Sequence, residues 1–269
     1  MSYQKYYVKD VKEKSSEKLF NVISCFAGGG GSSTGYRLAG ANILLINEFV
    51  EEAIKTYHAV YQVELRGKII GTSEFSVQPK PGENTYRFTS KMAVHGMLRL
   101  LQPNPILEHT DFIYEKNRIR PTEFWSQNTN GEEKNDLHII FNWDRGIATT
   151  TEGKATSVVE IQDNVLDRGS MQVAMMRDLS RDIEPGPYML VDGDSLKTYR
   201  YTYEGEATQE TPLGMIITRE YTQQRDNSTR QTSIWLAPEL SYLPVRIEQK
   251  RSSKTYAVFV LQSVKGLKK

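Results

Sequence analysis

The chain has 269 residues, with 34 Lys and Arg against 33 Asp and Glu, so its formal net charge is +1. A near-neutral protein gains no bulk electrostatic attraction to a polyanion, so a nucleic-acid role would need a local site. The mean hydropathy is −0.53, and the absence of a run of roughly 18 to 20 apolar residues predicts no membrane-spanning helix. The single cysteine, Cys25, excludes an internal disulfide and a zinc site built mainly from thiolates.

The predicted elements begin after a polar segment. Residues 1–18 carry both charge signs and lack the apolar core of a secretory signal peptide. We expect a solvated leader or short helix there and, for the chain as written, a cytoplasmic location. Residues 19–58 then follow the order strand, helix, strand, helix, with apolar runs at 19–23 and 43–46. Because such runs are typical of a parallel sheet covered on both faces, they predict a truncated βαβα Rossmann-like piece.

A glycine run, Gly28 to Gly31, follows the first predicted strand. Its composition also fits a flexible linker. Between a strand and a helix, however, a glycine turn presents backbone N–H groups and a positive helix end to an anionic or carboxylate-bearing cofactor. Glu48, at the end of the second strand, is placed to accept both hydroxyls of a ribose. The residues alone therefore predict a nucleoside cofactor without naming it.

This segment resembles the opening of DNA cytosine-5 methyltransferases. The matching residues are Phe26-Ala27-Gly28-Gly29-Gly30-Gly31, Gly35, Leu38-Ala39-Gly40 and Asn47-Glu48. The resemblance implies S-adenosylmethionine as cofactor, lined by Phe26, Gly28, Gly30 and Gly31, with Glu48 on its ribose. The family's later proline-cysteine and glutamate-asparagine-valine motifs are absent, and Cys25 lies in the first strand, where a small buried residue is expected. We therefore assign no catalytic residue.

From Tyr61 onward the apolar period is two. Alternation at 61–65, 137–143 and 199–203 gives each strand one apolar face, which is typical of antiparallel strands packed on one side. Turn residues separate the strands at Pro81-Gly82, Asn130-Gly131, Glu152-Gly153, Glu204-Gly205, 211–214 and 226–228. The predicted fold class is α+β and mostly β: a large curved antiparallel sheet, open or half barrel.

One helix is predicted within this sheet region, because Met171, Met175 and Leu179 recur every four residues and Pro185-Gly186-Pro187 ends the run. We expect it to cover the concave face of the sheet. Its methionines fit either an ordinary core or an adaptable surface that contacts a ligand.

Other residues with chemical potential form no complete motif. The aspartates fit surface turns better than a calcium loop, and the scattered histidines do not match a zinc hydrolase. The tyrosine alternation at 199–203 fits a sheet core, or alternatively a platform on which bases stack. The residues considered are Asp163, Asp167, Asp192 and Asp194; His58, His95, His109 and His138; and Tyr199, Tyr201 and Tyr203.

Residues 59–269 resemble a bacterial family of exported proteins that is classed as a domain of unknown function, DUF3108. The matching pieces are Tyr61 to Gly71 with Phe75, 141–146, 196–201, 210–214, 235–240 and 243–248. The resemblance implies a curved antiparallel sheet in a periplasmic or envelope protein, with no established reaction.

These observations predict three parts: a leader at 1–18, a cofactor-binding segment at 19–58 and a β domain at 59–269. The leading hypothesis is a non-enzymatic envelope-type protein whose concave apolar face binds an apolar ligand or an envelope protein partner. The alternative is a fragment of a DNA cytosine-5 methyltransferase that is completed by a separate chain, with DNA as partner only then. A third possibility is a fusion near residues 57–61 of two parts that were never selected together.

Overall fold

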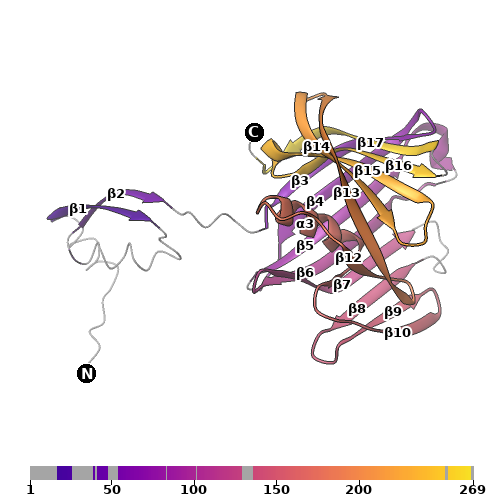
Figure 1. Ribbon diagram of the computed structural model, residues 1–269, viewed down its shortest axis with the longest axis horizontal. Coiled ribbons are helices and arrows are strands. Elements are labelled where there is room, and N and C mark those ends of the chain that lie inside the picture. The colour runs from indigo at the N-terminus through magenta and orange to yellow at the C-terminus, as the bar shows by residue number, and fades with distance from the viewer. Residues whose placement is uncertain are drawn as a thin grey trace. The chain divides into compact units, whose positions relative to one another are not determined.

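The computed structural model describes residues 17–25, 39, 41–47, 54–82, 84–100, 102–128, 136–251 and 254–267. The chain forms two compact units, Met1–Ala53 and Ile54–Lys269. In the first unit, β1 (Phe20–Cys25) and β2 (Ala41–Asn47) pair in parallel (Figure 1). This pairing agrees with the two apolar runs in the sequence.

The rest of the predicted βαβα piece is not shown. Its candidate cofactor residues, Phe26, Gly28, Gly30, Gly31 and Glu48, all lie outside the described residues. Tyr57, which the sequence places at the end of the second amphipathic stretch, is instead the first residue of β3. The reason is burial: Tyr57, Ala59 and Tyr61 alternate inward as buried residues of the large sheet.

The second unit is built on one sheet of fifteen strands. Apart from the parallel pair β11–β12, every neighbouring pair in this sheet is antiparallel. The strands are β3 (Tyr57–Leu65), β4 (Lys68–Pro79), β5 (Thr85–Val94), β6 (Ile106–Glu115), β7 (Arg118–Asn128), β8 (Leu137–Asn142), β9 (Ile147–Glu152), β10 (Ala155–Glu160), β11 (Val165–Leu166), β12 (Tyr188–Asp192), β13 (Ser195–Thr211), β14 (Gly214–Arg225), β15 (Arg230–Ala237), β16 (Leu243–Arg251) and β17 (Lys254–Lys265).

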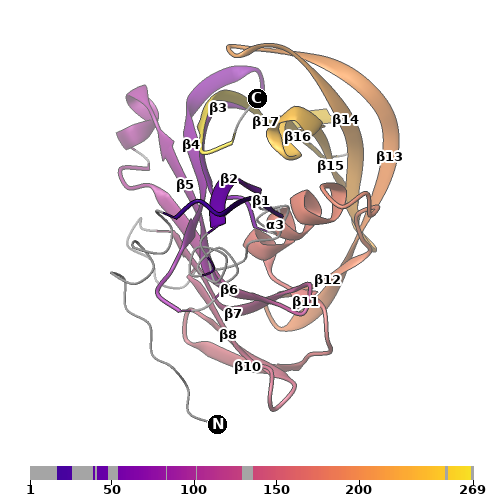
Figure 2. The ribbon, with the colours of Figure 1, turned by 90° about the vertical axis from the view of Figure 1, so that its left-hand side faces the viewer.

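The order of the strands makes two meanders that meet at the pair β3–β17, with β10 and β11 at the edges. The sheet curls around the helix α3 (Arg168–Leu179), which lies on its concave side (Figure 2). Within the described residues, the short 3-10 helices η1 (Gly96–Leu100) and η3 (Pro238–Leu240) occur in connections. The predicted curved antiparallel sheet with one covering helix is thus confirmed.

Local chemistry explains where α3 begins. The Asp167 side chain accepts hydrogen bonds from the backbone N–H groups of Gly169 and Ser170, while the Ser170 hydroxyl accepts from the Asp167 N–H. This reciprocal capping satisfies donors that a helix start leaves open. A Cβ on Gly169 would lie 2.3 Å from Thr110 Oγ1. Glycine therefore lets the helix start approach β6 closely.

Two apolar cores hold the unit together. The main core joins buried α3 residues, among them Met175 and Leu179, to side chains from both arms of the sheet, such as Phe112 and Leu261. A second core lies among β7 to β12 and includes Ile139 and Val191. Since burial of apolar surface is the main driving force for folding, both arms depend on the inner face that α3 covers.

The predicted turns are confirmed at 81–82, 152–153, 211–214 and 226–228, each of which joins two paired strands. Asn130-Gly131 lies outside the described residues. Glu204-Gly205 is not a turn: β13 runs through it, and its register against β14 shifts between Tyr203 and Gly205. The physical reason is a β-bulge, in which Gly205 takes a φ of 123° that other residues rarely adopt.

Candidate functional site

The candidate site lies on the inner face of three neighbouring strands, β14, β15 and β16. Every second residue of a strand shares a face, and the registers place Tyr221, Ile234 and Ile247 at one level and Gln223, Thr232 and Gln249 at the next. Toward one end of this face the side chains become charged. The three strands carry, in the same direction, Tyr221, Gln223 and Arg225; Ile234, Thr232 and Arg230; and Ile247, Gln249 and Arg251.

The apolar end of this face borders a cavity of about 200 Å³ between the sheet and α3. From the helix, Met171 and Met175 line it; from the sheet, Phe75, Ile234 and Phe259 do so. Methionine has an unbranched, polarizable side chain that adapts to differently shaped partners. Met175 is also buried in the main core. Both interpretations of the helix methionines therefore apply. Met175 and Met176 belong to the core, while Met171 and Met175 form a wall of the cavity.

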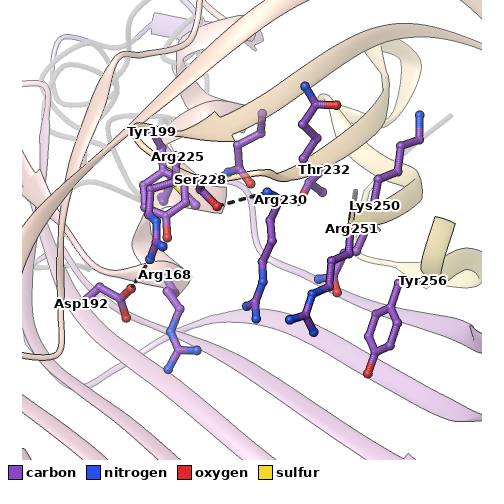
Figure 3. Close-up of a pocket in the computed structure, with 14 residues that line it drawn as sticks. Arg168, Asp192, Tyr199, Arg225, Ser228, Arg230, Thr232, Lys250, Arg251 and Tyr256 are labelled. Carbon is purple, nitrogen blue, oxygen red and sulfur yellow. Dashed lines mark hydrogen bonds and ion pairs between the residues drawn. The ribbon is translucent and has the colours of Figure 1, made fainter. Parts of the chain in front are cut away.

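A larger, polar cavity of about 520 Å³ adjoins the apolar one (Figure 3). We call this larger cavity the mouth. The two cavities share Arg168, Met171, Gln223, Thr232 and Gln249. The described residues that line this larger cavity include five cationic residues and one acidic residue, Asp192. The cationic residues are Arg168, Arg225, Arg230, Lys250 and Arg251.

Some of these cations have partners within the protein. Arg225 Nη1 lies 3.9 Å from Asp192 Oδ2, and Lys197 Nζ lies 3.4 Å from the same oxygen. Arg168 Nη2 lies 3.3 Å from Glu108 Oε1, and its guanidinium carbon is 5.2 Å from the centre of the Phe124 ring. These contacts hold one wall of the mouth in place.

Between the apolar and the charged levels, Gln223 connects the sheet to the helix. Its Nε2 donates to the Tyr201 hydroxyl at 2.6 Å and lies 3.6 Å from Met171 Sδ. Burial raises the pKa of Tyr201 above its ordinary value, although the hydrogen bond from Gln223 opposes this shift. Burial also raises the pKa of Tyr199, and the negative charge of Asp192 adds to this shift. Both hydroxyls therefore stay neutral at physiological pH.

The structure separates the residues that the sequence singled out. Among the aspartates, Asp167 caps α3, Asp163 binds Arg118 and Arg120, and Asp192 joins the mouth of the cavity. His138 lies on the polar face of β8, where its Nε2 is 2.9 Å from Glu123 Oε1. Tyr199 and Tyr201 pack against the main core, whereas Tyr203 is 48% exposed. No group of three or more potential metal ligands gathers among the described residues.

The sequence analysis missed the arginines of the mouth. A signal for them was present, because Arg225 and Arg230 flank the predicted turn at 226–228, which places them on adjacent strands. The third arginine, Arg251, is brought beside Arg230 by the next hairpin. Recognising the cluster needed the registers of two consecutive hairpins together, because each strand alone shows only one or two cations at its end.

The curled antiparallel sheet around one helix is the architecture of a β-barrel-like protein. A crystal structure of a β-barrel-like protein of domain of unknown function DUF1849 from Brucella abortus has a TM-score of 0.52 at 9% identity and covers 79% of this chain and 98% of that chain. At this identity the likeness shows the fold alone. In the described part of the chain, no helix has the length and apolar character to cross a membrane.

The family model of DUF3108, described as a protein of unknown function, matches residues 59–256. The chain belongs to this family, as the pattern of residues 59–269 predicts. No curated protein matches the chain. Nothing in these comparisons supports the methyltransferase resemblance of residues 19–58.

Two further solved structures are similar at lower scores. A candidate lipoprotein from Parabacteroides distasonis has a TM-score of 0.30 at 9% identity and covers 78% of this chain and 95% of that chain. A candidate exported protein with a YmcC-like fold from Bacteroides fragilis has a TM-score of 0.31 at 11% identity and covers 80% of this chain and 96% of that chain.

Proposed function

We propose that the second unit is a non-enzymatic binding protein that holds an apolar ligand between α3 and the concave face of the sheet. The observation that carries this proposal is the cavity of about 200 Å³ lined by Phe75, Met171, Met175, Ile234 and Phe259. Ligand sites are mostly apolar with a few placed polar groups. Gln223 and Thr232, at the junction with the mouth, supply such groups.

A neutral fluorescent probe, N-phenylnaphthylamine, tests the proposal on the full chain. We expect a saturable rise in fluorescence, because the probe leaves water for the apolar cavity. Met171→Trp places a larger side chain in the cavity wall at a partly buried position, so folding should survive. We expect this variant to bind about tenfold more weakly.

Ile140→Trp is the matched control, since Ile140 is 50% exposed on β8, away from the cavity lining. Circular dichroism and thermal melting verify that both variants fold. Absence of saturable binding, or equal loss of affinity in both variants, would remove the proposal.

We also propose, as a second candidate, that the first unit binds S-adenosylmethionine as a methyltransferase fragment completed by a separate chain. The parallel pairing of β1 with β2 supports it, because Cys25 and Asn47 are register partners at the ends of both strands. In the sequence the glycine run and Glu48 follow these ends. When bound, the cofactor would supply a methyl group for transfer.

Calorimetry with S-adenosylmethionine tests this second candidate. We expect weak binding that Glu48→Ala abolishes and that the control Glu51→Ala leaves unchanged. The absence of heat at millimolar cofactor rejects it. This result would leave the proposal for the second unit untouched, because its site uses none of these residues.

A further inference from the structure

The mouth of the cavity places like charges side by side. Arg230 on β15 and Arg251 on β16 are directly opposed Cα partners, and their side chains extend from neighbouring strands into the same space (Figure 3). Like charges at opposed positions destabilise a sheet. Among the residues that the structure describes, no carboxylate forms an ion pair with either arginine. The pair is therefore suited to an anion from outside the chain.

The surroundings strengthen this electrostatic argument. Asp192, the one carboxylate in the described lining of the mouth, already faces Arg225 and Lys197. Lys250 precedes Arg251 on β16, so its side chain lies on the opposite face of the sheet. There its Nζ donates to the Ser233 hydroxyl at 3.2 Å. The positive charge at Arg230 and Arg251 thus has no compensation from the described walls of the cavity.

The charged level is continuous with the apolar one. On β15, Arg230, Thr232 and Ile234 share one face, and the same order from charged to apolar recurs on β14 and β16. A ligand that fills both cavities must therefore be apolar at one end and anionic at the other. At about 200 Å³ the inner cavity is smaller than the roughly 300 Å³ at which typical ligand pockets begin, so it suits one narrow chain.

We infer that the ligand is a single-chain amphiphile with an anionic headgroup. Its chain lies against Met171 and Met175, and Arg225, Arg230 and Arg251 hold its headgroup. Guanidinium groups suit this role because they donate paired hydrogen bonds to carboxylate or phosphate oxygens. The inference rests on the proposed function, since it assigns the chemistry of the ligand for the same cavity.

Competition experiments with the full chain test the headgroup. The bound probe is N-phenylnaphthylamine, and each competitor has one chain of twelve carbons. Laurate and dodecyl phosphate are anionic, dodecanol is neutral, and dodecyltrimethylammonium is cationic. Inorganic phosphate alone distinguishes a free anion from a headgroup. We expect both anionic amphiphiles to displace the probe at concentrations about tenfold below that of dodecanol. We expect the cationic amphiphile and free phosphate to fail.

The double variant Arg230→Gln/Arg251→Gln should lower the affinity for both anionic amphiphiles by about tenfold or more and leave the affinity for dodecanol unchanged. The control Arg145→Gln/Arg181→Gln removes the same net charge from two exposed positions outside the cavity lining. This control should change neither the affinity for the anionic amphiphiles nor that for dodecanol.

The outcomes separate the two proposals. If dodecanol and laurate compete equally, or if the double variant lowers their affinities equally, the inference of an anionic headgroup is overturned and the proposed apolar site stands. If free phosphate competes as well as dodecyl phosphate, the site holds a free anion and the amphiphile is overturned. If neither the probe nor any amphiphile binds, the proposed function itself fails.

Discussion

The Thr110 hydroxyl on β6 donates a buried hydrogen bond of 2.7 Å to Oδ1 of Asp167, the residue that caps α3. The same oxygen accepts from the backbone N–H groups of Gly169 and Ser170. The other carboxylate oxygen, Oδ2, is buried and makes no hydrogen bond with any described residue. One carboxylate therefore fixes the start of the helix against the sheet while part of it is left unsatisfied.

This burial makes the stability of the unit depend on pH. Desolvation raises the pKa of Asp167 from 3.8 to about 6, although its hydrogen bonds oppose the shift. Between these pH values the folded protein holds a proton that the unfolded chain releases. The stabilising contribution of protonated Asp167 is therefore complete below 3.8, the pKa of this group in the unfolded chain. It is lost as the pH rises through about 6, its pKa in the folded protein.

Asp167→Asn removes this titration and keeps an oxygen acceptor for the cap. Relative to the wild type, the free energy of unfolding of the variant should increase from pH 4 to pH 7, by an amount on the order of 3 kcal/mol. Urea unfolding at each pH measures it. Asp163→Asn is the control: Arg118 lowers the pKa of Asp163 from 3.8, so its titration lies below the range tested and its difference from the wild type should change little between pH 4 and pH 7. A pH-independent difference for Asp167→Asn would contradict the burial argument.

Gly169→Ala should destabilise the unit. The added Cβ would lie 2.3 Å from Thr110 Oγ1 and 2.7 Å from Phe88 Cδ1, both of them in the buried interior. Forcing an extra methyl group into a packed interior costs about 1–3 kcal/mol. Urea unfolding measures the loss, and Arg181→Ala, at an exposed position just beyond the helix, should show none. Unchanged stability would mean that the helix shifts freely against β6.

Tyr61→Phe should cost about 1–3 kcal/mol, because it leaves a buried carbonyl without its donor. The fully buried Tyr61 hydroxyl donates to the Pro244 carbonyl oxygen at 2.8 Å and so links β3 to the start of β16. Chemical denaturation measures the change in the free energy of unfolding. Tyr256→Phe, at a 42% exposed position, is the matched control and should be neutral. A neutral Tyr61→Phe would show that water replaces the lost donor.

Limited proteolysis should cleave the chain within residues 1–53 and leave a resistant fragment from about Ile54 to the C-terminus. The chain divides into two compact units at this point, and compact units of one chain can open independently. Mass spectrometry of the fragments identifies the cut. Resistance of the whole chain, together with a single melting transition without added cofactor, would show that the first unit is integral to the fold.

Local sequence patterns predicted the elements of the second unit better than they predicted its site. The spacing of Met171, Met175 and Leu179 locates α3 because one face of a helix repeats about every four residues. Glu204-Gly205 misled because a glycine with positive φ serves a bulge as well as a turn. Here the pairing of β13 with β14 continues on both sides of Gly205, so the glycine belongs to a bulge and not to a turn.

The cavity itself could not be predicted from local patterns. It needs α3 to lie over strands from both meanders, so that Met171 meets Gln223 and Phe75 faces Phe259. Contacts of this kind depend on how far the sheet curls, which no single strand encodes. For the first unit, the parallel pair β1–β2 followed from the apolar runs. Its five candidate cofactor residues stay a prediction.

The pairing of β3 with β17 joins the first and the last strand of the large sheet. Partners such as Leu65 and Ala257 are separated by roughly 200 residues, and contacts of such long range slow folding. A chain synthesised from its N-terminus leaves one edge of β3 open until β17 is complete, and open edges invite pairing with other chains. Removal of β17 from the C-terminus would therefore split the sheet in its middle and expose β3 and β16 at once.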